Sequence, residues 1–276
     1  MKEILFGTAG IPHSTKGAGT IAGIRRVKEL GLGAMELEFV QNVNISENAA
    51  PEVRKTAEQE GIILTCHGQY YVNLASPEKA KAEASKKRML SAARILSACG
   101  GWSITWHLAF YQGQDREKVY AKVKGAMKEV RQKLADEGIT VWLRPETTGK
   151  PTQWGDLGEC IRLSQDIEQV LPCIDFAHLH ARTGGRENTL EEFRAQLALV
   201  EKGLGRECLD NMHIQISGIN YTEKGERNHL DLEESDLNWK QILQALKEFR
   251  CRGVVISESP NIEGDALLLQ KTLQKL

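Results

Sequence analysis

Cys173-Ile174-Asp175-Phe176-Ala177-His178-Leu179-His180 is the stretch from which the rest of the chain is best interpreted. A short apolar run leads into an aspartate, and two histidines follow it closely. Asp175 and His178 are three residues apart, a spacing that is common for metal ligands at the end of one strand. A single Asp-x-x-His is a weak signal, so its meaning depends on how the neighbouring segments of the chain end.

On both sides of this stretch, short apolar runs alternate with longer amphipathic ones, which indicates strands alternating with helices. Strand–helix alternation implies a parallel sheet, and eight such units fit a (β/α)8 barrel. The sequence therefore predicts the α/β class and a single TIM-barrel domain over residues 1–276. The expected strands are residues 2–7, 34–39, 62–66, 102–106, 140–143, 172–174, 212–216 and 253–257. The expected helices are residues 20–30, 46–61, 76–99, 115–137, 155–169, 189–202, 236–249 and 264–276.

A doubly wound open sheet is the alternative fold. It would require a glycine-rich phosphate loop directly after an early strand. Gly7-Thr-Ala-Gly10 is not a G-x-G-x-x-G motif, and Gly17-Ala-Gly19 does not directly follow a strand. The barrel is therefore the preferred prediction.

Composition narrows the functional classes. The net charge is −1, from 36 basic and 37 acidic residues, so no overall basic field indicates nucleic acid. The six cysteines are scattered through apolar segments without a C-x-x-C pair, which is typical of reduced core residues in a cytoplasmic protein. The N-terminus lacks the apolar core of a signal peptide, and no apolar run is long enough to span a membrane. We expect a cytoplasmic monomer with no membrane partner.

The ends of the expected strands carry the functional signal. In a (β/α)8 barrel the active site lies at the carboxyl ends of the strands. Strands three to eight each bring a histidine, aspartate or glutamate to, or close to, that rim. The residues are His67, His107, Glu146, Asp175 with His178, His213 and Glu258.

This set predicts a metal cluster. A lone histidine or carboxylate at a strand end usually has a structural role, but six consecutive strands with such residues are hard to explain as independent accidents. All are nitrogen or oxygen ligands of the kind zinc binds, and the massed carboxylates would repel one another without cations. Two or three ions would clamp a phosphate and stabilise a leaving oxygen. Manganese or magnesium would tolerate the same oxygen ligands.

Several segments together resemble the endonuclease IV family of apurinic/apyrimidinic endonucleases, within the xylose-isomerase-like TIM barrel superfamily. The resemblance spans nearly the whole chain and implies a barrel with three zinc ions that cuts the phosphodiester 5′ to an abasic site. The matching segments are His67-Gly-Gln-Tyr-Tyr-Val-Asn73-Leu, His107-Leu-Ala, Pro145-Glu146-Thr-Thr-Gly149, Cys173-Ile-Asp175-Phe-Ala-His178, Met212-His213 and Glu258-Ser-Pro260.

The resemblance also implies a role for each ligand. His67 and His107 would hold the first ion, and Glu146 would bridge it to the second. Three further residues would complete the second site, and His178 and His229 would belong to the third. Glu146 or Glu258 would act in catalysis by orienting the attacking water. The three residues of the second site are Asp175, His213 and Glu258.

One departure from the family pattern concerns the third ion. The family has an Asp-x-His pair in the loop after strand seven, whereas here Arg227 stands two residues before His229. Glu226 or Asp231 is a candidate replacement. His180 is an extra histidine without a family role, and we interpret it as structural.

The DNA-facing residues match the family in part. In the family, side chains from the loops after strands two and three enter the duplex and help to extrude the abasic nucleotide. Tyr70 occupies the matching aromatic position, with Asn73 in the same segment, and Arg182 is a candidate phosphate contact. The loop of residues 40–44 contains no arginine. Double-stranded DNA with abasic sites is the expected partner.

Two other functions remain open. The same superfamily includes sugar isomerases and epimerases built around one divalent ion, for which Glu146, Asp175, His213 and Glu258 would suffice. The altered third site, the arginine-free loop and the near-neutral charge favour this alternative. A barrel that binds DNA or a metabolite without turnover is the third hypothesis, because fold alone does not determine function.

Overall fold

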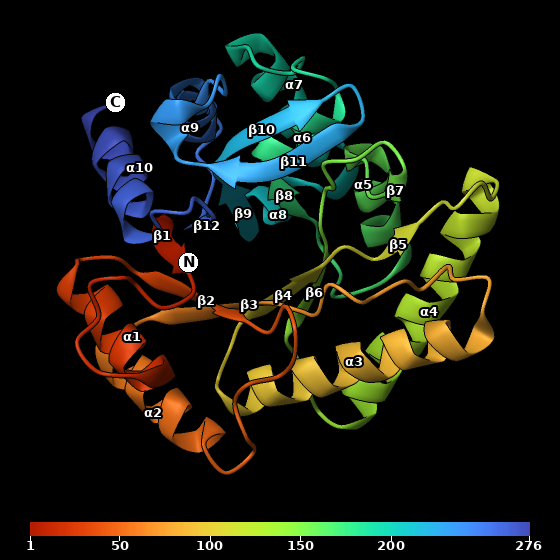
Figure 1. Cartoon of the computed structure of the whole chain (residues 1–276), viewed down its shortest axis with the longest axis horizontal. Helices are drawn as coiled ribbons and strands as arrows, with labels where there is room; N and C mark the ends of the chain where they lie inside the picture. The colour runs from red at the N-terminus through yellow and green to blue at the C-terminus, as the bar shows by residue number, and fades with distance from the viewer.

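The structure, a computed structural model that describes all residues 1–276, is a (β/α)8 barrel, as the sequence predicted (Figure 1). The eight parallel strands are β1 (Ile4–Ala9), β2 (Ala34–Glu38), β3 (Ile63–His67), β4 (Ser103–Trp106), β6 (Trp142–Pro145), β8 (Cys173–Asp175), β9 (Met212–Ile216) and β12 (Gly253–Ser257). They neighbour one another in chain order, and β12 pairs with β1. Bridges from Leu143 to Val170 and from Glu146 to Cys173 connect β6 to the segment that ends in β8.

Amphipathic helices surround the strands and bury one face against them. They are α1 (Gly19–Glu29), α2 (Ala50–Glu60), α3 (Lys79–Ala98), α4 (Arg116–Asp136), α5 (Leu157–Asp166), α6 (Phe176–Arg182), α7 (Leu190–Leu204), α8 (Arg206–Leu209), α9 (Trp239–Glu248) and α10 (Glu263–Lys275), with a 3-10 turn at Leu232–Glu234. Asp115, Asp156 and Thr189 cap α4, α5 and α7 by accepting hydrogen bonds from backbone N–H groups. Each cap satisfies a donor that the first helical turn leaves free.

Three pieces of structure near the carboxyl ends of the strands were not predicted. Helix α6 begins directly after β8, where the sequence suggested only a strand end and a turn. An antiparallel hairpin of β10 (Gly218–Thr222) and β11 (Gly225–Leu230) follows β9 and lies against α6 (Figure 1). A smaller antiparallel pair joins β5 (Ala109–Phe110) to β7 (Gln153–Trp154). These elements carry side chains to the mouth of the barrel.

The interior between strands and helices is a continuous hydrophobic core that contains five of the six cysteines, and all six are buried free thiols. This agrees with their prediction as reduced core residues. Burial raises the pKa of the Cys66 thiol well above its usual value, so this thiol stays protonated. None of the helices has the length and apolar character needed to cross a membrane.

Replacement of Gly68, which is next to His67, is expected to disturb the packing of the core strongly. A Cβ at this position would lie 1.7 Å from Nε1 of the buried Trp106, so an alanine side chain has no room. We expect Gly68→Ala to lower the free energy of unfolding by about 1–3 kcal/mol. Gly125, an exposed residue within α4, has no atom within 4 Å of its Cβ position. Gly125→Ala should instead raise stability by about 0.5–1 kcal/mol. Urea denaturation measures the free energy of unfolding of both variants. Equal changes in the two variants would contradict the close contact between Gly68 and Trp106.

Candidate metal centre

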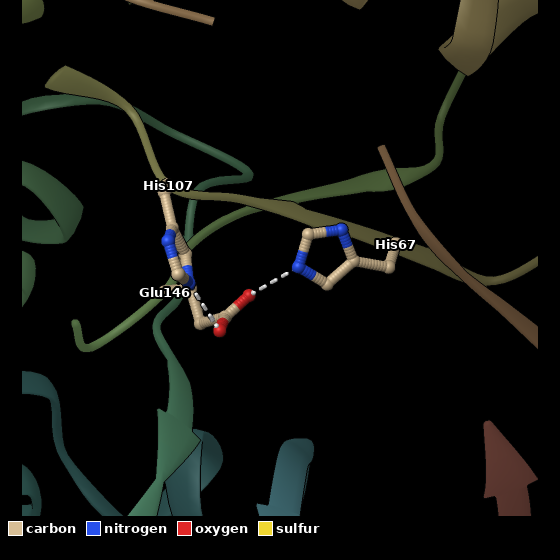
Figure 2. Close-up of side chains that lie close together, drawn as sticks. All are labelled: His67, His107 and Glu146. Atoms are coloured by element: carbon tan, nitrogen blue, oxygen red, sulfur yellow. Dashed lines mark hydrogen bonds and ion pairs between the residues drawn. The ribbon is translucent and has the colours of Figure 1, made fainter. Parts of the chain in front are cut away.

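The first ligand group comes from three consecutive barrel strands. His67 ends β3, His107 directly follows β4 and Glu146 directly follows β6, so parallel pairing brings them to one edge. Figure 2 shows the Glu146 carboxylate reaching between the two imidazoles. Its Oε1 lies 2.8 Å from Nε2 of His107, and its Oε2 lies 3.2 Å from Nε2 of His67. One ligand atom of each residue lies within 4.8 Å of the other two, a spacing that suits a shared ion.

Backbone contacts orient the ring of His67 for metal binding. Its Nδ1 lies 2.7 Å from the carbonyl oxygen of Gly68. A carbonyl can only accept, so Nδ1 carries a proton. Burial alone would lower the pKa of His67, but the charge of Glu146 raises it well above its usual value, so without an ion Nε2 is also protonated toward the Glu146 carboxylate. A bound cation would replace that second proton at Nε2. An Nδ1–H bonded to a carbonyl is the usual support for a histidine that binds metal through Nε2.

The second ligand group combines β8, α6 and the hairpin. Asp175 is the N-cap of α6, and its Oδ1 accepts a hydrogen bond from the backbone N–H of His178 at 2.6 Å. The Asp-x-x-His spacing is therefore a helix cap that places both side chains at the mouth. The other carboxylate oxygen, Oδ2 of Asp175, is buried without a hydrogen-bond partner. His229 reaches the same place from β11, and the three residues form the second candidate group.

The geometry of His178 and His229 fits a cation. Nδ1 of His178 lies 3.0 Å from the carbonyl of Thr147, and Nδ1 of His229 lies 3.1 Å from that of Glu258. Both rings therefore present Nε2 lone pairs, and these two atoms are 3.4 Å apart. A proton or a metal ion between them would remove the repulsion. The unpartnered Oδ2 of Asp175 favours the metal ion, because zinc binds imidazole nitrogen and carboxylate oxygen together.

Glu146 connects the two groups. Its Oε1, which contacts His107, also lies 3.3 Å from Nδ1 of His178. Burial alone would raise the pKa of Glu146, but the charges of His107 and His67 outweigh it and hold the pKa well below its usual value. The carboxylate of Glu146 is thus ionised and can bind a cation on either side. The sequence interpretation had Glu146 bridge the first ion to one held by Asp175, His213 and Glu258, whereas here the second group that it approaches is Asp175, His178 and His229.

Glu226, one of the two candidate replacements for the missing aspartate, lies beside the second group. Its Oε2 lies 3.6 Å from Nε2 of His178, and its backbone N–H donates to the carbonyl of Gly149 at 2.9 Å. A Cβ on Gly149 would come within 2.6 Å of the Glu226 side chain, so this approach requires glycine. Asp231, the other candidate, instead accepts a hydrogen bond from the backbone N–H of Asn261. Arg227 is exposed to solvent.

The mouth holds more carboxylates than the sequence interpretation identified. Burial, together with the charges of Glu146 and Asp175, raises the pKa of Glu258 well above its usual value. Burial and the neighbouring Glu36 raise the pKa of Glu38 to about 8. Both glutamates of β2 were missed, although Ala34-Met-Glu-Leu-Glu38 offered a signal: acidic residues recurring with period two in a strand expected to be buried.

His213 lies outside both ligand groups. It is the second residue of β9, three residues before the strand ends at Ile216, or roughly 10 Å below the rim. Its Nδ1 lies 3.0 Å from the hydroxyl of Ser103, and its Nε2 lies 2.8 Å from a carboxylate oxygen of Glu36. The structure therefore does not gather Glu146, Asp175, His213 and Glu258 into one group.

His180 occupies a structural position. Its ring is buried and lies between the carbonyl of Arg186 and the carboxylate of Asp236, each at 3.0 Å. Tyr221 of β10 packs edge-on against it and donates to the same carboxylate at 2.6 Å. Both ring nitrogens of His180 are therefore engaged, and neither is left to bind an ion.

The three residues suggested for DNA binding lie in different settings. Tyr70 is 55% exposed and packs edge-on against His67, with ring centroids 5.2 Å apart. The side-chain oxygen of Asn73 accepts from the backbone N–H of Ala75 at 3.2 Å. The guanidinium of Arg182 donates to oxygens of Thr148, Lys150 and Gln153 and so braces the loop after β6. Of the three, Tyr70 has the open position that a ligand needs.

Known proteins share this fold and family. The sequence profile of the xylose isomerase-like TIM barrel family matches residues 24–276. An uncharacterized protein of Methanocaldococcus jannaschii is 41% identical over 273 residues, which cover 99% of this chain and 98% of the relative. Endonuclease IV from Thermus thermophilus superposes with a TM-score of 0.75 at 17% identity, covering 99% of this chain and 100% of that one. A D-tagatose 3-epimerase-like protein gives 0.74 at 16%, covering 99% and 96%. The two structural likenesses show the fold alone, and from the profile match the chain belongs to the xylose isomerase-like TIM barrel family.

Proposed function

We propose that this protein is a zinc-dependent phosphodiesterase that hydrolyses DNA on the 5′ side of abasic sites. The observation that carries the proposal is the division of the ligands into two groups that meet at Glu146. A one-ion isomerase would need only one group. Two groups on either side of a shared carboxylate suit in-line displacement at phosphorus, which uses ions at both the attacking and the leaving oxygen.

The side chains around the phosphate would divide the work. Bound ions would polarise the phosphoryl oxygens and offset the charge on the leaving oxygen. Glu146 holds the two ligand groups at a fixed spacing. Glu258 has Oε1 tied to the amide of Gln215 at 2.9 Å, which leaves Oε2 to accept a proton from the attacking water. The water oxygen would bond to phosphorus as the bond to the 3′ oxygen breaks, and the 3′ oxygen would take a proton from solvent, so that the products carry a 3′ hydroxyl and a 5′ phosphate.

Exposed aromatic residues beside the metal groups support a nucleic-acid substrate. Tyr70 and Tyr71 are 55% and 65% exposed, which is unusual for such large side chains in a folded protein. They line a hollow of about 760 Å³ together with Lys81 and Arg88. Aromatic rings fill the space of a missing base by stacking, and cations next to them bind phosphates.

A second cationic hollow adjoins the other ligand group. Lys150, Lys224 and Arg227 line a space of about 590 Å³ together with Glu223 and Glu226. Contacts from the basic side chains to phosphates flanking the cleaved bond would orient the strand without reading its sequence. Each of the two hollows has one more basic than acidic residue, because Glu78 also lines the first, so together they give the mouth a modest local excess of positive charge.

Incision of a duplex with a single abasic site tests the proposal. We expect zinc-loaded protein to cut the abasic strand once, on the 5′ side, to leave intact duplex uncut, and to lose activity after chelation. A Glu146→Gln preparation purified in the same way controls for a contaminating nuclease. No incision by fully metallated protein would contradict the proposal.

Sugar epimerisation is the second candidate. The arginine-free loop after β2 and the near-neutral charge favour it, because neither suits a duplex. Its four expected ligands do not form one group here, since His213 contacts Ser103 and Glu36. Conversion of a ketose to its C3 epimer by the same metallated preparation, without incision, would make this the better assignment.

A further inference from the structure

A chain of polar side chains crosses the barrel interior beneath the metal groups. The interior of a (β/α)8 barrel is ordinarily filled by valine, isoleucine and leucine. Here several strand positions are fully buried polar or charged residues, and five that belong to neither ligand group form a connected chain. They are Glu36 on β2, Ser103 on β4, Arg144 on β6, and His213 and Gln215 on β9.

The donors in this chain are assigned by their partners. Nε of Arg144 donates to the hydroxyl oxygen of Ser103 at 2.7 Å, so the hydroxyl hydrogen is left for Nδ1 of His213 at 3.0 Å. His213 then carries its proton on Nε2, which lies 2.8 Å from Oε2 of Glu36, although not aligned for a straight hydrogen bond. The hydroxyl of Thr65 donates to the same oxygen at 2.7 Å. Glu36 is therefore held from two strands besides its own.

Gln215 links this chain to the mouth of the barrel. Its amide nitrogen donates to Oε1 of Glu36 at 2.8 Å and to Oε1 of Glu258 at 2.9 Å. Its amide oxygen accepts from the thiol of Cys173 at 3.2 Å. An amide turned the other way would place an oxygen against two carboxylates, so these partners allow one orientation. A single NH₂ group thus fixes the distance between two acidic side chains that would otherwise repel each other.

We propose that Gln215, held in place by Glu36, is a positioning residue that fixes the carboxylate of Glu258 beside His229 of the second ligand group, where Oε2 of Glu258 lies 3.9 Å from Nδ1 of His229. The inference rests on the metal centre described above but not on the identity of the substrate. It gives β9 a supporting role: His213 contributes to the hydrogen-bonded chain rather than to an ion. It also explains why β9 carries polar residues at two successive inward positions.

A double-mutant cycle on the metal-free protein, titrated with Co²⁺, tests this role without any substrate. Gln215→Met keeps the side-chain length and removes the amide. We expect it to retain the number of bound ions but to weaken one ion by about 10–100-fold, with a changed visible spectrum of bound Co²⁺. Glu258→Gln should weaken the same ion, and the double variant should lose little more than Glu258→Gln alone, because Gln215 acts through Glu258.

The matched control is Gln165→Met, which removes an amide from α5 far from the mouth and should leave Co²⁺ binding unchanged. Glu36→Gln should reproduce the weakening, because an amide can turn its own NH₂ toward Gln215. Unchanged affinity in folded Gln215→Met protein, or losses that simply add in the double variant, would overturn the proposal. Coupled losses in a protein that fails to cut abasic DNA would uphold the positioning role and reject only the proposed substrate.

Discussion

Glu146→Gln is expected to reduce abasic-site incision by roughly 10³-fold or more, as when an electrostatic contributor is removed from a preorganised site. The carboxylate lies within 3.3 Å of ring nitrogens from His67, His107 and His178, so it serves both ligand groups. Glutamine removes the charge and turns N–H donors toward atoms that need an acceptor or a cation. Single-turnover incision at saturating enzyme measures the loss without contributions from product release.

The control for this prediction is another glutamate. Glu137 forms an exposed ion pair with Arg94, and such pairs contribute little to stability. Glu137→Gln should incise at the wild-type rate. Near-wild-type incision by Glu146→Gln protein with an unchanged circular-dichroism spectrum would show that the two ligand groups do not act together.

His107→Ala and His229→Ala are each expected to remove one ion per chain, and the double variant to remove two. The two residues belong to separate groups on separate parts of the fold, after β4 and on β11, so loss of one ligand leaves the other three-residue group complete. Elemental analysis of zinc after dialysis against a weak chelator gives the count directly. The expected result is one ion fewer in each single variant.

His180→Gln is the matched control for these two variants. His180 is buried like a ligand, but it contacts Asp236 and a backbone carbonyl instead of either group. The protein should keep its full zinc content when this histidine is replaced. Loss of all zinc in His229→Ala, or of one ion in His180→Gln, would contradict the assignment of the groups.

The barrel was predictable because its signals are local. Apolar runs bounded by glycine and proline predicted all eight barrel strands, with β9 and β12 correct to the residue. The strand at β6 lay two residues later than expected, since Pro145 ends the strand instead of following it. Proline is tolerated at this position because the N–H that continues the pairing with β4 belongs to Glu146, which donates to the carbonyl of Trp106 at 3.1 Å.

The second ligand group was only partly predictable because it depends on contacts far apart in the sequence. His178 was identified from its spacing, but its approach to His229 requires α6 and the hairpin to pack together. Neither element has an apolar pattern long enough to be recognised. The role of Glu226 likewise depends on close contact with Gly149, which sequence alone does not reveal.

The position of His213 illustrates a different limit. Its strand was predicted correctly, and the histidine is the second of five residues in it. A ligand at the mouth of a barrel is expected at the end of a strand rather than at its start. The family resemblance nevertheless suggested His213 as a metal ligand. Its partners, Ser103 and Glu36, lie on other strands and can be identified only from the structure of the barrel interior.

Anomalous scattering from crystals of the zinc-loaded protein, recorded on both sides of the zinc absorption edge, tests the central claim most directly. The two-group arrangement predicts one peak among His67, His107 and Glu146 and another among Asp175, His178 and His229. A single peak bound by Glu146, Asp175, His213 and Glu258 would contradict it, because those four residues form the one-ion site of a sugar isomerase.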